Sequence, residues 1–269
     1  MDFRRKFLVE PGRKFRLSDV DPDFHGKFTS EEEAQPELDR YKQKLTSMQR
    51  LFYGDRNHAL LIVLQGIDGA GKDGTCWHVI SAMDPQGVKV QGFKQPTPEE
   101  HAHDFLWRVH PQVPSNGQIA IFDRSHYEDV LIVRVHDLVP ETRWQARYAH
   151  IRAFEKMLAD EGTVILKFFL HISKDEQAER LRARLADPTK NWKFRTSDLD
   201  ERGHWDEYQD AYEEMVRRTA AEHAPWFVVP ANRKWFRDLV ICHTLIDTLE
   251  RLDLHYPEPS DDLSGVTIE

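Results

Sequence analysis

An unbroken apolar run followed at once by a glycine-rich turn is the feature that most constrains how this chain can fold. Residues 59–65 read Ala-Leu-Leu-Ile-Val-Leu-Gln, a pattern typical of a strand buried on both faces of a parallel sheet. The turn that follows, residues 66–75, reads Gly-Ile-Asp-Gly-Ala-Gly-Lys-Asp-Gly-Thr. Glycines let successive amide N–H groups point inward, and the helix that begins near Lys72 adds partial positive charge. The sequence therefore predicts a phosphate-binding loop; a tight turn without a ligand is the alternative, which the spacing GxxxxGK after a buried strand disfavours.

Two carboxylates make this loop unusual. The loop positions that we expect to bind phosphate or nucleotide are Gly66, Gly69, Ala70, Gly71, Lys72, Asp73, Gly74 and Thr75. Asp73 occupies the position where such loops usually carry a Ser or Thr that binds magnesium, and Asp68 lies inside the loop. An acid repels phosphate unless a cation lies between them or a basic side chain pairs with it. Asp68 is therefore a candidate to contact Mg²⁺ or to orient the acceptor phosphate.

A second cluster of chemically useful residues ends the apolar run 119–122. Asp123 follows this run directly, which places its carboxylate at the carboxyl edge of a parallel sheet. If the strand neighbours residues 59–65, this is where a magnesium-binding acid is needed; a simple strand-end cap is the alternative. Arg124 can supply a bidentate phosphate contact. Arg134, on the helix predicted next, is expected either to bind phosphate or to form a surface ion pair.

The rest of the chain alternates strand and helix patterns. Further strands are predicted at 87–93, 118–122, 163–172 and 226–229, and helices at 73–83, 98–110, 143–160, 174–185 and 235–252, with another helix that begins after Ser30. This alternation predicts right-handed crossovers and an α/β fold with a doubly wound, parallel five-stranded sheet flanked by helices. We expect residues 1–30 to form an extended arm, 31–255 a single domain, and 256–269 a flexible acidic tail.

Charge is unevenly distributed along the chain. The formal net charge of −9 argues against a general nucleic-acid coat or an anionic-membrane binder, which need a basic surface. Residues 180–195 nevertheless hold six basic residues and one acid. They follow the fourth strand, where small-molecule kinases of this topology carry a mobile lid that closes arginines onto a transferring phosphoryl group. We expect a helical lid at about 174–215 that brings Arg180, Arg184, Lys190 and Lys193 to phosphate; a solvated basic face is the alternative.

Several classes of protein are disfavoured by what the sequence lacks. The longest apolar runs fall far short of the roughly 20 residues that a membrane span needs. The N-terminus carries no secretory signal pattern, and the two cysteines, Cys76 and Cys242, are expected to be structural thiols in a reducing cytoplasm. The 14 histidines show no zinc-ligand spacing. We therefore expect a cytoplasmic protein without a nucleic-acid or membrane partner.

Five separated motifs, in this order, carry a resemblance that covers about residues 35–255. They are IDGAGKDGT, FKQPTPEE with FLWRVH behind it, FDRSHYEDVLIVRV, RLRARLADPTKNWKF and APWFVVPANRKWFRDLV. Together they resemble the second polyphosphate kinase family, polyphosphate kinase 2. The resemblance implies a P-loop kinase fold similar to that of thymidylate kinase, and reversible transfer of the terminal phosphate of inorganic polyphosphate to ADP or AMP. It further implies Mg²⁺ or Mn²⁺ as cofactor, ATP and guanine nucleotides among the ligands, and a homo-oligomer, either dimer or tetramer.

The resemblance also implies roles for single residues. The implied catalytic residues are Asp68, Lys72, Asp123, Arg124, Arg180 and Arg184, with Asp68 and Asp123 holding Mg²⁺. Lys94 is expected either to touch phosphate or to be a surface lysine, and Gly69 stands where relatives often carry Ala. The Asp-Gly pair after Lys72 and the sequence SHYED resemble the branch that accepts both AMP and ADP. An ATP-dependent nucleotide or nucleoside monophosphate kinase, which shares fold and loop, is the alternative function, and a non-catalytic nucleotide sensor is a further one.

Overall fold

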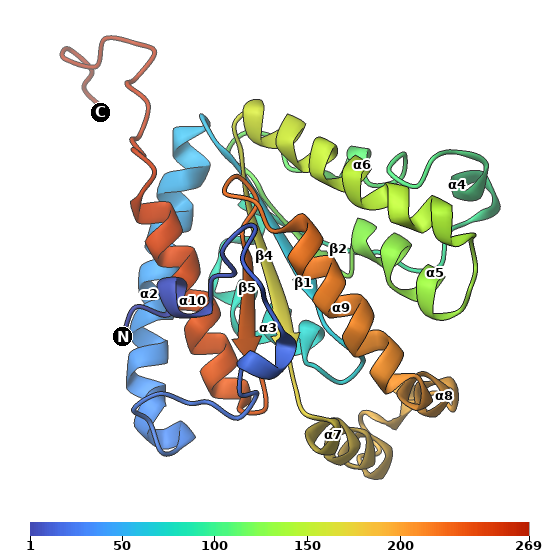
Figure 1. Cartoon of the computed structure of the whole chain (residues 1–269). Coiled ribbons are helices and arrows are strands. Elements are labelled where there is room, and N and C mark those ends of the chain that lie inside the picture. The colour runs from blue at the N-terminus through green and yellow to red at the C-terminus, as the bar shows by residue number, and fades with distance from the viewer. Residues whose placement is uncertain (269) are drawn as a thin grey trace.

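Five parallel strands form the central sheet of this chain (Figure 1). The computed structural model describes residues 1–268. The strands are β1 (Ala59–Gln65), β2 (Val88–Gly92), β3 (Ile119–Asp123), β4 (Thr163–His171) and β5 (Trp226–Pro230). Their order across the sheet is β2-β3-β1-β4-β5, so β3 and β4 flank β1. The register pairs Leu64 of β1 with Asp123 of β3, which brings the two sequence segments with candidate chemistry to the same edge.

Helices cover both faces of the sheet (Figure 1). The α-helices are α1 (Phe3–Phe7), α2 (Glu31–Asp55), α3 (Lys72–His78), α4 (Pro98–Ala102), α5 (Ile132–Val135), α6 (Glu141–Asp160), α7 (Lys174–Ala186), α8 (Ser197–Gly203), α9 (Trp205–Thr219) and α10 (Lys234–Glu250). Helices α2 and α10 pack side by side on one side, and α6 and α9 lie on the other. Every residue of β1 is buried, as expected for a central strand between two helical layers.

The predicted fold class is confirmed, and each predicted strand lies within a residue of an observed one. The helix expected at 98–110 is wrong beyond Ala102. Asp104 interrupts it, because its side chain accepts a hydrogen bond from the Leu106 amide (3.0 Å) and its carbonyl accepts one from the Trp107 amide (3.1 Å). Such local bonds offer the backbone an alternative to helix. The helix expected at 73–83 ends at His78 and continues only as a single 3₁₀ turn.

The N-terminal segment is not simply extended. Asp2 caps the short helix α1, whose Phe3 and Phe7 rings both meet the ring of Phe236 on α10 edge to face. The Val9 amide then donates to the Trp226 carbonyl at 2.9 Å. These contacts bury apolar side chains that a solvated arm would expose, so the segment packs as part of the domain.

Residues 256–268 are exposed and form neither helix nor strand; Glu269, the last residue of the predicted tail, lies outside the described residues. In the part of the chain that the structure describes, no helix has both the length and the apolar character needed to cross a bilayer. Cys76 and Cys242 are both free thiols, as predicted.

A buried polar cluster connects β4 to helices α6 and α9. The Lys167 ammonium is fully buried and donates to Glu155 Oε2 (2.6 Å), Tyr127 Oη (2.8 Å) and the Thr219 carbonyl (2.9 Å). Lysine has three N–H donors, so each of them has a partner. The cluster ties the 3₁₀ helix η5 (His126–Val130), which follows the end of β3, to α6 and α9.

Candidate active site

The glycine-rich loop turns between β1 and α3 at the carboxyl edge of the sheet. Gly69 and Gly71 both adopt positive φ angles, +87° and +103°, which residues with a Cβ rarely adopt. At Gly71 a Cβ would also lie only 2.1 Å from Nη1 of Arg237, so a glycine is required there for two reasons. The structure thus places the predicted loop in the conformation that the glycines make possible.

Asp68, inside the loop, pairs with two cations. Its Oδ1 lies 2.5 Å from Nη2 of Arg124 and 4.0 Å from Nζ of Lys72. Partial burial alone would raise the pKa of Asp68, but the charges of Lys72 and Arg124 outweigh it and hold the pKa below its usual value. Asp68 is therefore ionised at neutral pH and holds both basic side chains at the edge of the sheet.

Arg124 reaches this position through an unusual backbone conformation. Its φ is +63°, in the left-handed region that non-glycine residues seldom occupy. Its second nitrogen, Nη1, lies 3.8 Å from Oε2 of Glu128 on η5. The guanidinium is thus oriented by two carboxylates, one on the loop and one on η5.

Lys72 lies folded against its own loop. Its Nζ donates to the carbonyls of Gly66 (2.5 Å) and Ile67 (3.4 Å). Burial, together with the nearby charge of Arg124, lowers the pKa of this ammonium, while Asp68 and Asp123 oppose the shift. Because lysine carries its charge on a flexible stem, the same ammonium can also reach a phosphate in the loop.

Asp123 and Asp73 bring two carboxyl groups into contact. Burial and the neighbouring Asp73 carboxyl raise the pKa of Asp123 to about 6, although Lys72 opposes this. Two touching carboxylates are disfavoured unless a proton or a cation lies between them, and carboxylate oxygens are preferred ligands of Mg²⁺. Among residues 1–268 no group of three or more His, Cys, Asp or Glu side chains is arranged to hold a metal alone. Mg²⁺ is often bound by only one or two carboxylates together with the phosphates of the substrate. The Asp123–Asp73 pair fits this kind of site.

Of the predicted lid residues, Arg180 is the most constrained. Its Nε donates to Glu176 Oε1 (2.6 Å), and its Nη1 donates to the carbonyls of Gly69 and Ala70, both at 2.9 Å. Its Nη2 donates to two further carbonyls, those of Ala231 (2.5 Å) and Asn232 (3.0 Å). All five N–H donors of the guanidinium thus have acceptors within the protein.

The other predicted lid residues pair with acids. Arg184 lies 3.4 Å from Asp198, and its charge also helps to lower the pKa of Asp68. Lys193, on the 3₁₀ helix η6 (Asn191–Lys193), contacts Asp73 at 3.0 Å and so bridges the lid to the loop. Lys190 pairs with Asp187, its neighbour in the lid, at 2.7 Å.

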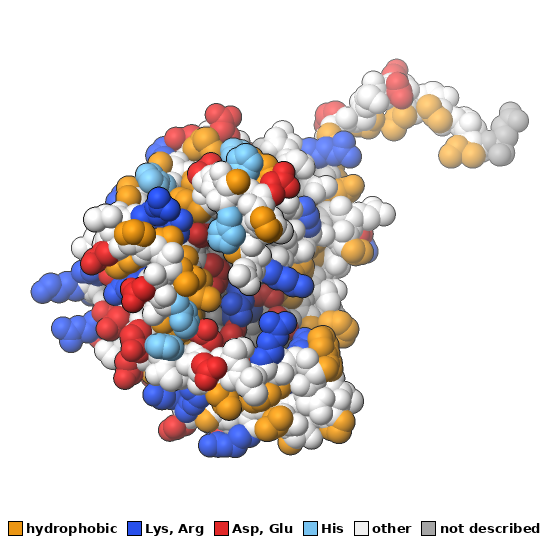
Figure 2. All heavy atoms as spheres, turned by 90° about the vertical axis from the view of Figure 1, so that its right-hand side faces the viewer, with side chains coloured by type: hydrophobic (Ala, Val, Ile, Leu, Met, Phe, Trp, Pro, Cys, Tyr) orange, Lys and Arg blue, Asp and Glu red, His pale blue; other side chains and the backbone are white. Residues whose placement is uncertain are grey.

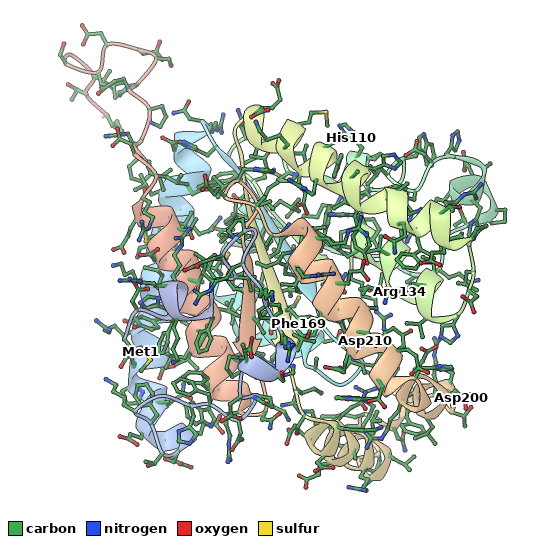
Figure 3. All side chains as sticks on the ribbon, in the orientation of Figure 1. Met1, His110, Arg134, Phe169, Asp200 and Asp210 are labelled. Carbon is green, nitrogen blue, oxygen red and sulfur yellow. The ribbon has the colours of Figure 1, made fainter. Side chains whose placement is uncertain are left out.

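Two predicted phosphate-binding residues lie apart from this cluster. Arg134 of α5 points toward α9, where it pairs with Glu214 at 2.7 Å (Figure 3), the ion pair that the sequence left as the alternative. Lys94 is exposed in the connection between β2 and α4, and its carbonyl accepts a hydrogen bond from Arg108 at 2.8 Å.

Three residues at the site were not among the predicted ones: Glu128, Gln177 and Arg237. Glu128 orients Arg124, while Gln177 Nε2 and Arg237 Nη1 donate to the carbonyls of Asp68 (2.8 Å) and Gly71 (3.1 Å). Each lies in a segment that the motifs contain or adjoin, but no spacing rule connects α7 or α10 to the loop. Only the fold brings them together.

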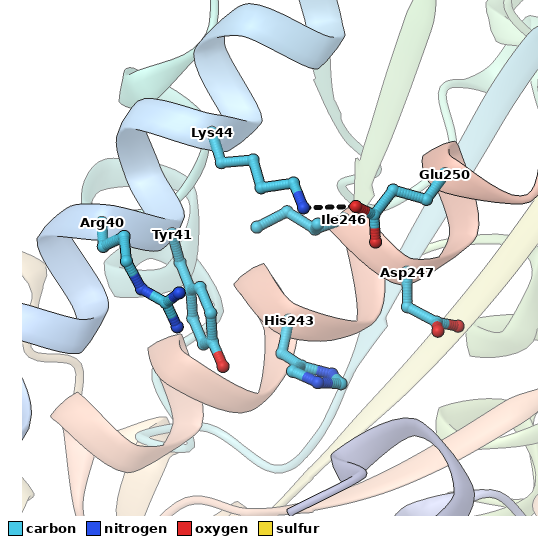
Figure 4. A pocket seen from close by; sticks show the side chains of 7 residues that line it. All are labelled: Arg40, Tyr41, Lys44, His243, Ile246, Asp247 and Glu250. Carbon is cyan, nitrogen blue, oxygen red and sulfur yellow. Dashed lines mark hydrogen bonds and ion pairs between the residues drawn. The ribbon is translucent and has the colours of Figure 1, made fainter.

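Charged side chains of both signs are mixed over the face of the molecule formed on the side of α4, α5 and α8 (Figure 2). A separate hollow of about 220 Å³ lies between α2 and α10; Figure 4 shows the side chains that line it. Tyr41 and His243 form its walls, and a Lys44–Glu250 ion pair crosses one side. None of its lining residues belongs to the loop, the end of β3 or the lid.

Comparisons with known proteins agree with this geometry. The family described as Polyphosphate kinase 2 (PPK2) matches residues 28–257. An AMP/ADP-polyphosphate phosphotransferase of Meiothermus ruber is 51% identical, over 98% of this chain and 100% of its own. An ADP-polyphosphate phosphotransferase of Rhodopseudomonas palustris is 42% identical, over 94% of this chain and 92% of its own.

A solved structure, polyphosphate kinase 2 from Arthrobacter aurescens TC1, superposes with a TM-score of 0.93 at 43% identity, covering 98% of this chain and 94% of that one. The family match and these relatives span nearly the whole chain, including the loop, the end of β3 and the lid. This P-loop kinase fold with its glycine-rich loop beside Asp123 and Arg124 therefore belongs to the polyphosphate kinase 2 family, and the chain is a phosphotransferase.

Proposed function

We propose that this enzyme transfers the terminal phosphate of inorganic polyphosphate to both ADP and AMP, reversibly and with Mg²⁺ or Mn²⁺. Transfer between polyphosphate and nucleotides is the activity of its family. The observation that carries the proposal is the register that sets Asp123 and Arg124 beside the phosphate loop, at the edge where a parallel sheet binds its ligand. The name of the Meiothermus ruber relative, which includes both AMP and ADP, supports the pair of acceptors.

Lys72 and Arg124 are proposed to neutralise charge on the transferring phosphate. Both are held at the loop by Asp68, at 4.0 Å and 2.5 Å. Phosphoryl transfer needs positioning and charge neutralisation more than a protein nucleophile, and a single arginine can contribute several powers of ten in rate. Arg184, close enough to Asp68 to affect its pKa, adds a further positive charge from the lid.

The metal site is proposed at Asp123, with Asp73 as the second carboxylate. An Mg²⁺ ion held there would supply positive charge that neutralises the bound phosphates. Asp68, implied as a ligand by the family resemblance, remains the alternative second carboxylate; its ion pairs with Arg124 and Lys72 support a positioning role.

In the proposed mechanism a phosphate oxygen of the nucleotide attacks the terminal phosphorus of polyphosphate in line. The bond between that phosphorus and its bridging oxygen breaks, and the shortened polyphosphate leaves with the electron pair. No covalent enzyme intermediate is formed. The chain's own residues bind and orient the two anions: Lys72 and Arg124 lie at the loop, and Arg184 adds positive charge from the lid segment.

The test measures ATP formed from polyphosphate plus ADP, and ADP formed from polyphosphate plus AMP, by purified protein with Mg²⁺. Lys72→Met should lower kcat by about a hundredfold or more, because it removes a charge at the phosphate. Lys156→Met, on the exposed face of α6 where Lys156 pairs with Asp160, is the matched control and should leave turnover unchanged. Phosphorylation of a nucleotide by ATP alone, with none from polyphosphate, would instead identify an ATP-dependent kinase, and binding without turnover would identify a sensor.

Three finer properties are also proposed. Guanine nucleotides are expected to be accepted, because the loop contacts phosphate through backbone groups that do not read a base. A homo-oligomer, dimer or tetramer, is expected, and the large exposed fraction of Trp77 (75%) is consistent with a contact surface on α3. A cytoplasmic location agrees with the two free thiols.

A further inference from the structure

Every carbonyl oxygen of the loop from Gly66 to Gly71 accepts a hydrogen bond. Lys72 of the same motif donates to the first two, the carbonyls of Gly66 and Ile67. The next three are bonded by side chains of the distant helix α7, whereas the Gly71 carbonyl accepts a helical hydrogen bond from the Thr75 amide of α3 (2.9 Å) and a further one from α10. Gln177 and Arg180 of α7 donate to the carbonyls of Asp68 (2.8 Å), Gly69 (2.9 Å) and Ala70 (2.9 Å), and Arg237 of α10 donates to that of Gly71 (3.1 Å).

These bonds fix the direction of the amide N–H groups. In a planar trans peptide the carbonyl of one residue and the N–H of the next point in opposite directions. Holding the carbonyls of Asp68 and Ala70 toward α7 therefore turns the N–H groups of Gly69 and Gly71 the other way, and the bond from Arg237 reinforces the direction that α3 gives to the Gly71 carbonyl. Inward-pointing N–H groups are what allows such a loop to bind phosphate.

The donors are themselves rigidly held. Arg180 bonds at the same time to Glu176 and to two carbonyls in the turn between β5 and α10. Arg237 is only 1% exposed, and its Nε donates to Asp238 at 2.8 Å. Its guanidinium also fills the space beside Gly71, where a Cβ would lie only 2.1 Å from Nη1. A planar guanidinium with fixed partners is better suited to hold peptide groups than to follow a moving phosphate.

We propose that Gln177, Arg180 and Arg237 are positioning residues that hold the phosphate loop in its binding conformation by engaging its carbonyl groups. The proposal rests on the proposed function, because it takes the loop as the phosphate site. It gives Arg180 a role different from contact with the transferring phosphate, and it adds Arg237, which no motif rule singles out. It also anchors α7 to the loop through Gln177 and Arg180, so the movable part of the proposed lid begins after this helix.

The expected effect is a change in binding rather than in the chemical step. Without the carbonyl partners the loop samples conformations that do not bind, and apparent affinity falls in proportion to the fraction that remains competent. At saturating substrate nearly every molecule holds the loop in its binding conformation, so kcat changes little. Loss of a group that touches the transferring phosphate would instead lower kcat.

The experiment compares Arg180→Met, Arg237→Met and Arg237→Met/Asp238→Asn with the wild type. The double variant avoids leaving Asp238 buried without its partner, in case Arg237→Met fails to fold. Measurements are the kcat and KM for polyphosphate and ADP, the Kd for tripolyphosphate by calorimetry, and the Tm. We expect KM and Kd to rise about tenfold while kcat stays within about threefold. Arg251→Met, at an exposed ion pair at the end of α10, is the matched control and should change none of these.

Arg180→Lys separates geometry from charge. It keeps the positive charge but cannot span four carbonyls, so we expect it to behave as Arg180→Met does. Full recovery of wild-type KM by Lys would overturn the proposal, and so would an unchanged KM and Kd in folded Met variants, or a hundredfold loss of kcat at unchanged KM. If wild-type protein binds tripolyphosphate but transfers no phosphate, the proposed function fails; a higher Kd in the variants would then still support the positioning role.

Discussion

Asp123 ends a buried strand beside the loop, and its carboxyl touches that of Asp73. This like-charge contact is unfavourable for the folded chain alone and becomes favourable when a divalent cation joins the two groups. A residue in such a setting serves function at some cost to stability. Asp68 is different, because Arg124 and Lys72 already satisfy its charge.

Asp123→Asn should therefore lower the activity without lowering the stability of the fold. We expect kcat to fall by about a hundredfold or more, since a neutral amide binds the cation more weakly. The Tm should stay the same or rise, because the substitution removes the repulsion with Asp73. Thermal unfolding and initial rates on the same preparation check this; a variant with full activity would move the metal site elsewhere.

His171, at the end of β4, gives a prediction for pH. Burial lowers the pKa of this imidazole from 6.5 to about 4. Between these values the unfolded chain binds a proton that the folded chain does not, so folding stability falls as the pH is lowered from 6.5 toward 4. The contribution is about 3 kcal/mol at most.

Replacing the imidazole with a ring that cannot be protonated should remove this dependence. The free energy of unfolding of His171→Phe, measured by urea titration at several pH values, should fall less than that of the wild type between pH 7 and 5. Parallel curves for the two proteins would contradict the assignment.

At the scale of elements, the strands and the loop were predictable because their signals are local. A buried apolar run, glycine spacing and an acid at a strand end each lie within about ten residues of sequence. The partners of the loop carbonyls were not predictable, because Arg237 lies 166 residues from Gly71 along the chain. The prediction of a helix at 98–110 was wrong for a local reason, because the Asp104 side chain accepts a hydrogen bond from the nearby Leu106 amide and the helix does not continue.

We predict that the lid proposed at residues 174–215 has a fixed and a mobile part. Gln177 (1% exposed) and Leu181 (4% exposed) are buried on α7, whereas most of residues 187–200 are half-buried or exposed. Hydrogen exchange should accordingly be slow in α7 and fast in 187–200, and polyphosphate with ADP and Mg²⁺ should slow the second segment. Equal protection of both segments in the free enzyme would contradict this division.

At the scale of the whole molecule, the formal charge of −9 does not prevent the chain from binding a polyanion. Five of its acids lie in residues 253–269 of the sequence, and the four that the structure describes are exposed in the C-terminal segment. Near the loop, Lys72, Arg124 and Arg184 concentrate positive charge, and the acids among them hold these bases or fit a metal. The distribution of charge, rather than its sum, decides which anions can bind.

The measurement that tests the account most directly follows radiolabelled phosphate from polyphosphate into nucleotide. Purified protein is incubated with labelled polyphosphate, unlabelled ADP and Mg²⁺, and the products are separated. We expect label in the terminal phosphate of ATP, no label when Mg²⁺ is chelated, and at least a hundredfold less label in Lys72→Met, because this variant lacks a charge at the phosphate. Unlabelled ATP, or no ATP, from folded wild-type protein would contradict the proposed transfer from polyphosphate.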